Sequence, residues 1–456
     1  MVNDWSLSTL DEAGIILIDC VHETPPDAGI GYPYIAIPQI KNGYIDFSAN
    51  PRLIKYSDYK KWTIKANPQA DDIVLSRRCN PGETAYVPKG VEFALGQNLV
   101  LLRSSGEKVY PPFLRWLVRG PEWWAQVSKY LNVGAVFDSL RCAEIPKFEL
   151  SIPPLHEQKA IADILGSLDA KIELNQDMNK TLEAMAQALF KSWFVNFDPV
   201  IDNALAAGNP IPDELFDRAE QRKTIKKNEN NRAIRSLFPD ELEFNKEMGW
   251  IPKGWSITPV YEVADFINGS SFKSQYFSDE KEALPIVKIA EIKNGISEQT
   301  KFTTQKMAEK YAINDGDILF SWSGNPDTSI DTFIWTGGKG WLNQHIFNVV
   351  LHKDSDKTFV YYLLKYLKPI FTEIARDKQT TGLGHVTVKD MKRIYTIKPP
   401  VEVLEAFGLY SDSIFEKWYQ NLFSSKELAK LRDTLLPKLI SGEIRIPEAE
   451  PLVEDV

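Results

Sequence analysis

The sequence predicts an α+β protein in which two tandem mixed α/β domains are separated by two long helices that pair as a coiled coil. Three observations lead to this fold class. The chain of 456 residues repeats itself, which indicates a pseudo-twofold internal repeat. Each copy opens with short apolar runs that turn residues interrupt, and each copy closes with a long helical pattern. A chain of this length also exceeds what one hydrophobic core normally serves.

The repeat is visible in several matching segments. The tetrapeptide IKNG occurs at residues 40–43 and again at residues 292–295. Its flanks agree as well, because YPYIAIPQIKNGYID in the first copy corresponds to LPIVKIAEIKNGISE in the second. The pair Pro153-Pro154 matches Pro399-Pro400, so the offset changes from 252 (292 − 40) to 246 (399 − 153). Loop insertions change the offset in this way between two copies of one fold.

The first part of each copy reads as strands. Runs such as YPYIAIP and DILFSW combine β-branched and aromatic residues, and glycine, proline and asparagine bound them. We therefore predict one mixed domain at residues 1–152 and a second at residues 250–398.

The second part of the first copy reads as a long helix. After Pro154 the chain contains no proline until Pro199. Apolar residues recur at spacings of three and four, at Ile161, Leu165, Leu168 and Ile172. This spacing is typical of a coiled-coil seam, so we predict a central helix at residues 153–196. Polar Asn175 and Asn179 interrupt the seam.

The second copy contains a matching helix, which we predict at residues 399–442. Its apolar positions include Leu428, Leu431 and Leu435. Gly442 suits the position after a helix end, and Pro437 predicts a kink or a break in the last turn. Because both helices follow a Pro-Pro pair, they are expected to pack together. The alternative is two unrelated amphipathic helices on a large domain.

Two segments remain outside these domains and helices. Residues 197–249 contain AAGNPIP and the charge run EQRKTIKKNENNR, which predict a linker or irregular segment with short helices. Residues 443–456 are predicted to form an acidic tail.

Motifs for catalysis are missing from the sequence. There is no phosphate-binding G-x-x-x-x-G-K-[ST] loop, and Gly382 and Gly384 lack the third glycine of a dinucleotide fingerprint. The Asn-Pro-Pro-aromatic motif of adenine methyltransferases is also missing. The five histidines and three cysteines are too scattered for a zinc site, and Asp213, Glu220 and Lys223 are wrongly spaced for a nuclease. We therefore expect no catalytic residue, metal or cofactor in this chain.

The composition predicts a cytoplasmic protein without a membrane segment. No apolar run approaches the ~18–20 residues that a membrane span needs, and the N-terminus lacks the pattern of a signal peptide. The net charge of −9 is unevenly distributed. Residues 151–249 and 401–456 carry −5 each, whereas residues 1–150 carry −1 and residues 250–400 carry +2. A near-neutral domain can still present a basic face to nucleic acid.

Candidate DNA-binding residues follow the strand-like run of each copy. In the first copy DDIVLSRRCNPG brings Arg77 and Arg78 after the run, and the corresponding GDILFSWSGNPD has different side chains there. Arginine can read guanine edges and asparagine can read adenine. A retained frame with changed loop content indicates two modules that read different sequences. The candidates are Ser76, Arg77, Arg78, Asn80 and Lys89 in the first copy, and Ser321, Ser323, Asn325, Lys339, Asn343, Gln344, His345, Thr380 and Thr381 in the second.

Five segments of the chain resemble a known family. The segment IPPLHEQKAIADILGSLDAKIELNQ is similar to the central helical region of the specificity (S) subunits of type I restriction–modification systems. The segments SWFVNFDPV, SLFPDELE, IPKGWSITPVYEVA and LRDTLLPKLISGEIRI are similar to the same family, in the same order. The chain departs from the family where DWSLSTL replaces a Pro-x-Gly-Trp start. It also departs where KPPVEVLEAF lacks a pair equivalent to Glu157-Gln158.

The resemblance implies that residues 1–152 and 250–398 are target recognition domains, each reading one half of a bipartite double-stranded DNA site. It implies that the two long helices pack antiparallel, set the spacer and dock two methyltransferase (M) subunits. Translocase–endonuclease (R) subunits would complete the complex. S-adenosylmethionine, ATP and magnesium would belong to those partners. A helix at 1.5 Å per residue over residues 155–194 would be roughly 60 Å long, and the half-sites would be about 34 Å apart. The alternative is a coiled-coil scaffold that does not bind DNA.

Overall fold

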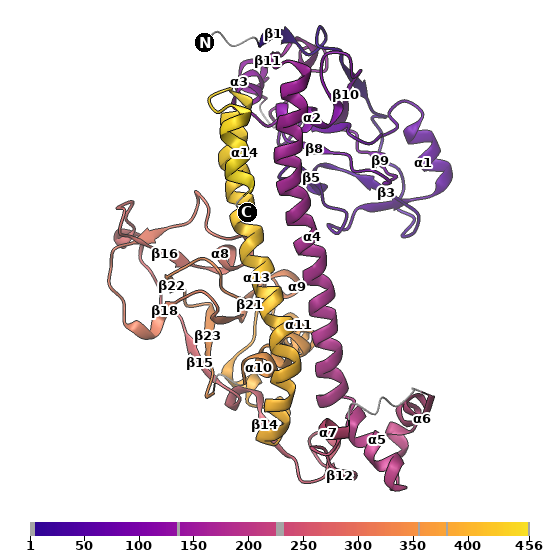
Figure 1. Cartoon of the computed structure of the whole chain (residues 1–456), viewed down its shortest axis with the longest axis vertical. Coiled ribbons are helices and arrows are strands. Elements are labelled where there is room, and N and C mark those ends of the chain that lie inside the picture. Colours follow the sequence, from indigo (N-terminus) through magenta and orange to yellow (C-terminus); the bar gives the residue numbers. More distant parts are fainter. Residues whose placement is uncertain (1–4, 135–136, 225–231, 354–355, 380–381, 455–456) are drawn as a thin grey trace. The chain divides into compact units, whose positions relative to one another are not determined.

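The computed structural model describes residues 5–134, 137–224, 232–353, 356–379 and 382–454. The chain divides into two compact units (Figure 1). The first unit comprises Met1–Leu174 and Ser424–Val456, and the second comprises Asn175–Phe423. Two long helices, α4 (Leu155–Phe194) and α13 (Val401–Ile440), each contribute one half to each unit. Within the described residues, no helix is both long enough and apolar enough to cross a membrane.

The core of the first unit is a four-stranded antiparallel sheet in the order β2 (Ile15–Asp19), β10 (Leu99–Ser104), β7 (Ile73–Ser76) and β8 (Thr84–Tyr86). Strand β7 reads IVLS and is buried throughout, because both faces of the sheet are covered. One face packs on helix α2 (Pro111–Leu117) and on the long helices. The other face packs on a smaller sheet in the order β6 (Arg52–Ile54), β3 (Tyr32–Ile35) and β9 (Ala94–Leu95).

Shorter elements complete the first unit. Strand β1 pairs with β11, and β4 forms a hairpin with β5. These elements are β1 (Ser6–Thr9), β4 (Ile40–Lys41), β5 (Tyr44–Ile45), β11 (Glu149–Ile152), α1 (Tyr56–Thr63), α3 (Pro121–Tyr130), α14 (Ile446–Glu454) and the 3-10 turns η1 (Ile37–Gln39) and η2 (Ile145–Lys147).

The second unit repeats this topology. Its main sheet has the order β15 (Asp265–Asn268), β23 (Ile346–Val350), β19 (Ile318–Ser321) and β21 (Asp331–Ile334), again antiparallel. Its second sheet has the order β17 (Phe302–Thr303), β16 (Leu284–Val287), β22 (Gly340–Leu342) and β18 (Ala312–Ile313). The parallel pair β16–β22 corresponds to β3–β9 of the first unit. The predicted internal repeat is therefore present in the four strands of the main sheet and in β6, β3 and β9, which correspond to β17, β16 and β22.

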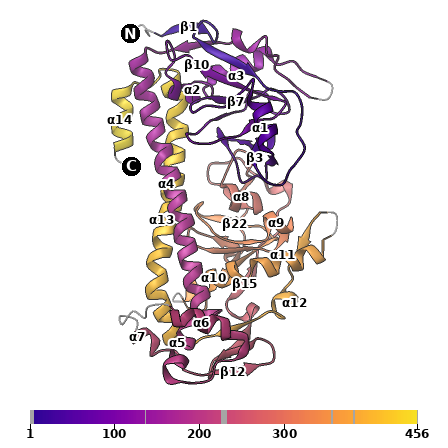
Figure 2. The ribbon, with the colours of Figure 1, turned by 90° about the vertical axis from the view of Figure 1, so that its right-hand side faces the viewer.

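The remaining elements of the second unit surround these sheets (Figure 2). Strand β14 pairs with β25, as β1 pairs with β11, and β20 pairs with β24. The elements are β12 (Leu242–Asn245), β13 (Gly249–Pro252), β14 (Ser256–Pro259), β20 (Ser323–Gly324), β24 (Gly384–His385), β25 (Tyr395–Lys398), α8 (Ile289–Asn294), α9 (Pro326–Ser329), α10 (Lys357–Tyr366), α11 (Lys368–Asp377), α12 (Val388–Met391), η5 (Val260–Glu262), η6 (Ser274–Tyr276) and η7 (Glu309–Tyr311).

The repeated IKNG tetrapeptide ends a short helical turn in both units. Gln39 and Glu291 are buried, and each accepts a hydrogen bond from the backbone amide three residues earlier at 3.0 Å. Gly43 and Gly295 both have positive φ, at 86° and 81°, a conformation that glycine adopts without strain. The first copy continues into the β4–β5 hairpin, whereas the second ends α8. The two copies of the tetrapeptide therefore occupy equivalent positions, but the chain continues differently after them in the two units.

In the first unit the two long helices pack antiparallel around a buried carboxylate. The predicted seam residues of α4 lie in the core together with Leu428, Leu435 and Leu439 of α13. Asp169 is 2% exposed and accepts hydrogen bonds from Arg115 and, at 2.6 Å, from Arg432. These contacts anchor α4 to both α13 and the recognition domain through α2.

In the second unit the same two helices meet through an asparagine pair. Asn179, which interrupts the apolar pattern, is buried and donates to the carbonyl oxygen of Trp418 at 3.0 Å. Asn421 in turn donates to the Asn179 side-chain oxygen at 3.0 Å. Phe190 and Phe407 pack nearby, at 6.3 Å between ring centroids. The predicted antiparallel pair is confirmed.

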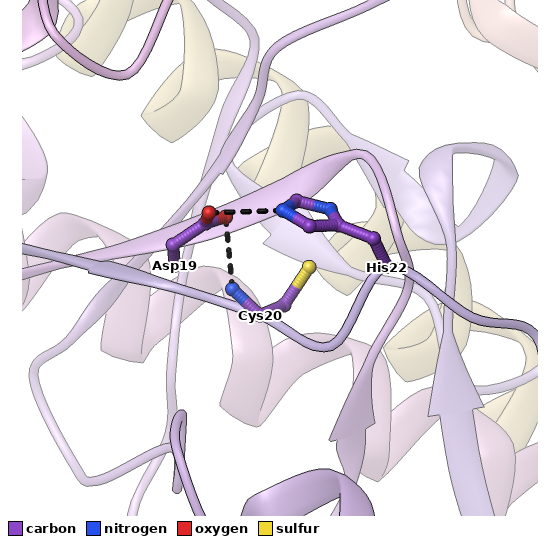
Figure 3. Close-up of side chains that lie close together, drawn as sticks. All are labelled: Asp19, Cys20 and His22. Carbon is purple, nitrogen blue, oxygen red and sulfur yellow. Dashed lines mark hydrogen bonds and ion pairs between the residues drawn. The ribbon is translucent and has the colours of Figure 1, made fainter.

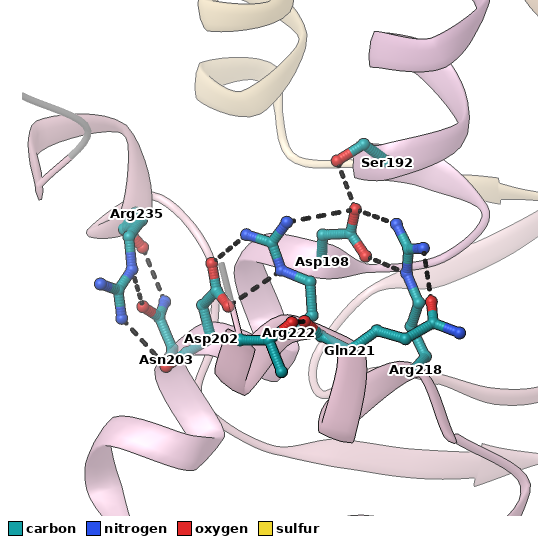
Figure 4. A network of polar contacts seen from close by, with 9 residues as sticks. Ser192, Asp198, Asp202, Asn203, Arg218, Gln221, Arg222 and Arg235 are labelled. Carbon is teal, nitrogen blue, oxygen red and sulfur yellow. Dashed lines mark hydrogen bonds and ion pairs between the residues drawn. The ribbon is translucent and has the colours of Figure 1, made fainter. Parts of the chain in front are cut away.

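The segment between the copies is largely ordered. It contains α5 (Asp198–Ala207), η3 (Asp213–Leu215), α6 (Phe216–Thr224) and α7 (Arg232–Arg235). Buried Asp198 pairs with Arg218, and Asp202 pairs with Arg222 (Figure 4). These ion pairs hold α6 against α5, so the short helices that the sequence suggested pack as a small subdomain in the described part of this segment.

Two expectations about the C-terminal end differ from the structure. Pro437 does not break α13, which continues to Ile440. Burial of Leu435, Leu439 and Ile440 in the core of the first unit outweighs the lost backbone hydrogen bond. The acidic tail contains a packed helix, α14, whose Ala449 is fully buried.

Candidate nucleic-acid interface

The candidate site of the first unit is built where β7 and β9 end side by side. The backbone amide of Arg77 donates to the carbonyl oxygen of Asn98 at 3.0 Å. The amide of Leu140 donates to the carbonyl oxygen of Arg77 at 2.9 Å. Gly96, directly after β9, donates to Ile35 of β3 at 2.7 Å. Three loops that are distant in the sequence are therefore held together by backbone hydrogen bonds.

The second unit has the same frame with other side chains. Trp322 donates from its backbone amide to the carbonyl oxygen of His345 at 3.4 Å, and Val386 donates to Trp322 at 2.8 Å. Asn343 donates to Val287 of β16 at 3.0 Å. The hydrogen bonds make Arg77 structurally equivalent to Trp322, and Asn98 equivalent to His345.

Three of the predicted site residues are buried, so their side chains do not lie on the surface. Ser76 and Ser321 are the last residues of central strands and are 0% exposed. The Ser76 hydroxyl donates to the carbonyl oxygen of Arg78 at 2.9 Å and so shapes the loop. Asn343 is also buried, in the turn after β22. Because these three side chains are buried in this structure, we expect them to support the site rather than to contact DNA directly.

Other predicted residues do lie on the surface of this frame. Arg78, Asn80 and His345 are exposed, and Ser323 and Gln344 are half-buried. Asn325 is exposed, but its side-chain oxygen caps α9 by accepting from the amides of Asp327 and Thr328, at 3.0 and 3.1 Å.

The side chains of Arg77 and Trp322 lie toward the end of β2 or β15, the strand beyond β10 or β23 in the same sheet. Arg77 is half-buried, and its charge acts on Cys20, which follows β2. Burial raises the pKa of the Cys20 thiol to about 11, with Asp19 adding to the rise and Arg77 opposing it. The Trp322 indole donates to the Asn268 side chain, in β15, at 3.0 Å. Trp322 thus packs inside the frame.

Two predicted lysines lie away from this frame. Lys89 follows β8 at the end opposite to the loop that joins β7 to β8. Lys339 precedes β22, whereas the frame residues follow it, and its Nζ lies 3.8 Å from Glu309. Thr380 and Thr381 lie outside the described residues.

The structure adds site residues that the sequence analysis missed. Gln97 is exposed and Asn98 half-buried, and both line a cavity of about 640 Å³ in the first recognition domain. Asn50, Arg52 and Cys79 also line this cavity. Aligning GQN at residues 96–98 with NQH at residues 343–345 would have found Gln97 and Asn98.

Among the described residues, one group has side chains close enough to share a metal ion: Asp19, Cys20 and His22 (Figure 3). The polar atoms of these three side chains already have hydrogen-bond partners within the protein. The two ring nitrogens of His22 lie 2.9 Å from Asp19 Oδ2 and 3.0 Å from the carbonyl oxygen of Gln97. The Cys20 thiol donates to the carbonyl oxygen of Gly96 at 3.3 Å. A metal would require the thiolate, which burial disfavours. The group therefore fits a brace for the loop at residues 96–98 better than a metal site.

A family model described as “Type I restriction modification DNA specificity domain” matches residues 23–184 and 252–403. The two matches cover more than half of the chain and fall once in each repeat. The chain belongs to the specificity-subunit family of type I restriction–modification systems.

Curated relatives and one solved structure agree with this assignment. The chain is 26% identical to the type I restriction enzyme HindI specificity subunit of Haemophilus influenzae, over 83% of this chain and 88% of the relative. It is 25% identical to the MjaIX specificity subunit of Methanocaldococcus jannaschii, over 98% and 94% of the two chains. The fold is similar to that of the S subunit from M. genitalium, with a TM-score of 0.53 and 15% identity, over 96% and 97% of the chains.

The family settles the general role of the two domains. This S subunit supplies DNA specificity to a type I restriction–modification system and carries two target recognition domains. Specificity subunits are non-catalytic, as the missing enzymatic motifs predict.

Proposed function

We propose that each recognition domain reads one half of a bipartite double-stranded DNA site, the first with residues 1–152 and the second with residues 250–398. The observation that supports this most is the shared frame. The backbone hydrogen bond that joins Arg77 to Asn98 in the first domain has its equivalent between Trp322 and His345 in the second, but the side chains differ. Because side chains on base edges carry sequence information and the frame only positions them, two such loops would read two different half-sites.

The segments at residues 153–196 and 399–442, which contain α4 and α13, would set the unread spacer between the half-sites. Their polar contacts support this role. Asp169 with Arg432 in the first unit, and Asn179 with Asn421 in the second, are buried hydrogen-bonded pairs that favour one register of the seam. A fixed register is what a spacer of constant length requires.

Exposed apolar side chains on the long helices support docking of two M subunits. Leu174 is 62% exposed in the first unit, and in the second Leu409 is 81% exposed beside Tyr410 on α13. Apolar residues grouped on one element often mark a protein interface. R subunits would join this complex in the cytoplasm. S-adenosylmethionine would bind the M subunits, and ATP and magnesium would act on the partners.

The test uses the complex with its M subunits and maps methylated adenines by single-molecule sequencing. We expect Arg78→Ala to relax or change the half-site read by the first domain, and His345→Ala to do so in the second. Both residues are exposed, so the complexes should assemble normally. If either variant altered the half-site assigned to the other domain, or if both altered the same one, the assignment would be wrong.

A further inference from the structure

The two recognition domains have several structurally equivalent surface positions that lie outside the loops after β7 and β19. Resting on the proposed function, we infer that Arg52 and Lys301 bind DNA phosphate at equivalent places in the two half-sites. Beside them, Gln97 contacts a base edge in the first half-site, and Asn98 and His345, at equivalent positions, discriminate between the two sequences.

Strand pairing establishes that Arg52 and Lys301 are equivalent. Arg52 lies opposite Tyr34 in the β3–β6 pair. Lys301 directly precedes β17, and its carbonyl oxygen accepts from the amide of Ile286 at 2.8 Å. The residues that follow Tyr34 and Ile286 also correspond. The carbonyl oxygen of Ile35 accepts a hydrogen bond from Gly96, and that of Val287 accepts one from Asn343. Both positions thus carry an exposed cation at the same edge of the same small sheet.

The turn after the parallel strand makes the two glutamines equivalent. In the first domain Leu99 donates to the carbonyl oxygen of Gly96 at 2.9 Å, which closes a turn around Gln97 and Asn98. In the second domain Ile346 donates to Asn343 at 3.3 Å and closes the same turn. Each turn therefore carries a glutamine first and a different polar side chain second. Gln97 is exposed, whereas the side-chain oxygen of Gln344 is buried.

The backbone of Gln97 is held from both sides. Its amide donates to the Tyr34 hydroxyl at 3.1 Å, and its carbonyl oxygen lies 3.0 Å from His22 Nδ1. The side chain is exposed. A fixed backbone with a free carboxamide reduces the entropy that is lost when a base is bound, and a carboxamide can pair with the N6 and N7 edge of adenine.

The cavity of about 640 Å³ places these groups together in the first domain, because Arg52, Gln97 and Asn98 all line it. Arg52 donates from Nη1 to the carbonyl oxygen of Pro25 at 3.0 Å, which leaves the rest of its exposed guanidinium for phosphate. Asp27 shares the cavity, and its carboxylate accepts from the amides of Gly29 and Leu53 at 3.0 and 3.3 Å. The cation of Arg52 can position the domain on a phosphate, while the neighbouring carboxamide of Gln97 reads a base edge.

The experiment measures binding of the S subunit with its M subunits to duplexes that carry the mapped site, across a range of salt concentrations. Arg52→Ala and Lys301→Ala should weaken binding to every sequence equally and lower the salt slope by about one, whereas Arg52→Lys should retain the slope. Gln97→Ala should lose roughly 10- to 100-fold of the discrimination at one base pair of the first half-site. Gln69→Ala, an exposed glutamine before the other end of β7, is the matched control and should change nothing.

The reciprocal exchange tests discrimination. Asn98→His should change the preferred base in the first half-site only, and His345→Asn should do so in the second only. Unchanged specificity in Gln97→Ala and Asn98→His, with an unchanged salt slope in Arg52→Ala, would overturn the inference while the wild-type complex still recognised its site. A wild-type complex without any bipartite preference would instead refute the proposed function.

Discussion

Removing the buried carboxylate of Asp169 should strongly destabilise the first unit. Asp169 is 2% exposed and is paired with Arg115 and Arg432, whose side chains are 15% and 11% exposed. Arg119 lies in the same cluster, where burial, followed by the charge of Arg432, lowers the pKa of its guanidinium. In Asp169→Ala three guanidinium groups would converge without their carboxylate. Breaking a buried ion pair in this way costs about 3–5 kcal/mol.

The size of the unit converts this cost into a temperature. The first unit has 207 residues (174 + 33). At roughly 2.1 cal/mol/K per residue, its unfolding entropy near the midpoint is about 0.43 kcal/mol/K, so the variant should melt about 7–12 °C lower. Calorimetry of the purified chain measures this shift. Asp163→Ala, an exposed aspartate on the same helix, is the matched control and should shift the melting temperature by about 1 °C or less.

A second variant separates the ion pair from simple packing. Replacing Asp169, Arg115, Arg119 and Arg432 together by methionine should recover much of the loss, because apolar groups do not leave a buried charge unpaired. A melting temperature of Asp169→Ala within 2 °C of the wild type would refute the view that this carboxylate holds α4 against α13 and α2.

Three further predictions concern the helices and the thiols. Asn179→Leu should cost about 1–3 kcal/mol, because the Asn421 amide loses its acceptor, and Asn179→Leu with Asn421→Leu should restore stability in urea titrations. Alkylation at pH 8 should modify exposed Cys79 well before Cys20, whose burial raises the thiol pKa to about 11; mass spectrometry of the modified peptides decides this. Inserting four residues after Asn175 and at the matching point of α13 adds about 6 Å to each helix. Methylation mapping should then show a spacer about two base pairs longer. An unchanged spacer would contradict the proposal that the helices set its length.

The sequence predicted the helices well because their signal is periodic and local. Ile161, Leu165 and Leu168 recur at the spacing of a seam, and all three are buried. Of the two outcomes predicted for Pro437, a kink or a break, the helix does not break, because buried leucines around the proline hold it in place and the sequence does not display their packing.

The site was predicted less completely than the fold, for a different reason. The sequence identified the loop after β7, but it did not show that Ser76 points inward. A strand that is buried on both faces has no alternation of polar and apolar residues, so the direction of its last side chain is not visible. Gln97 was missed because its importance depends on a neighbour 63 positions away, Tyr34, which the sheet brings into contact.

The buried polar pairs explain how two similar helices avoid pairing in the wrong register. An apolar seam alone tolerates a slip of one heptad, because leucine and isoleucine would meet again after seven residues. Such a slip would place Asn179 against Ile414 or Leu428 instead of Asn421, and it would place Asp169 against Ser425 or Leu439 instead of Arg432. Either arrangement buries a polar group without its partner, at a cost of about 1–3 kcal/mol for the amide and more for the carboxylate. The residues that weaken the apolar pattern are therefore the ones that fix the register of α4 against α13.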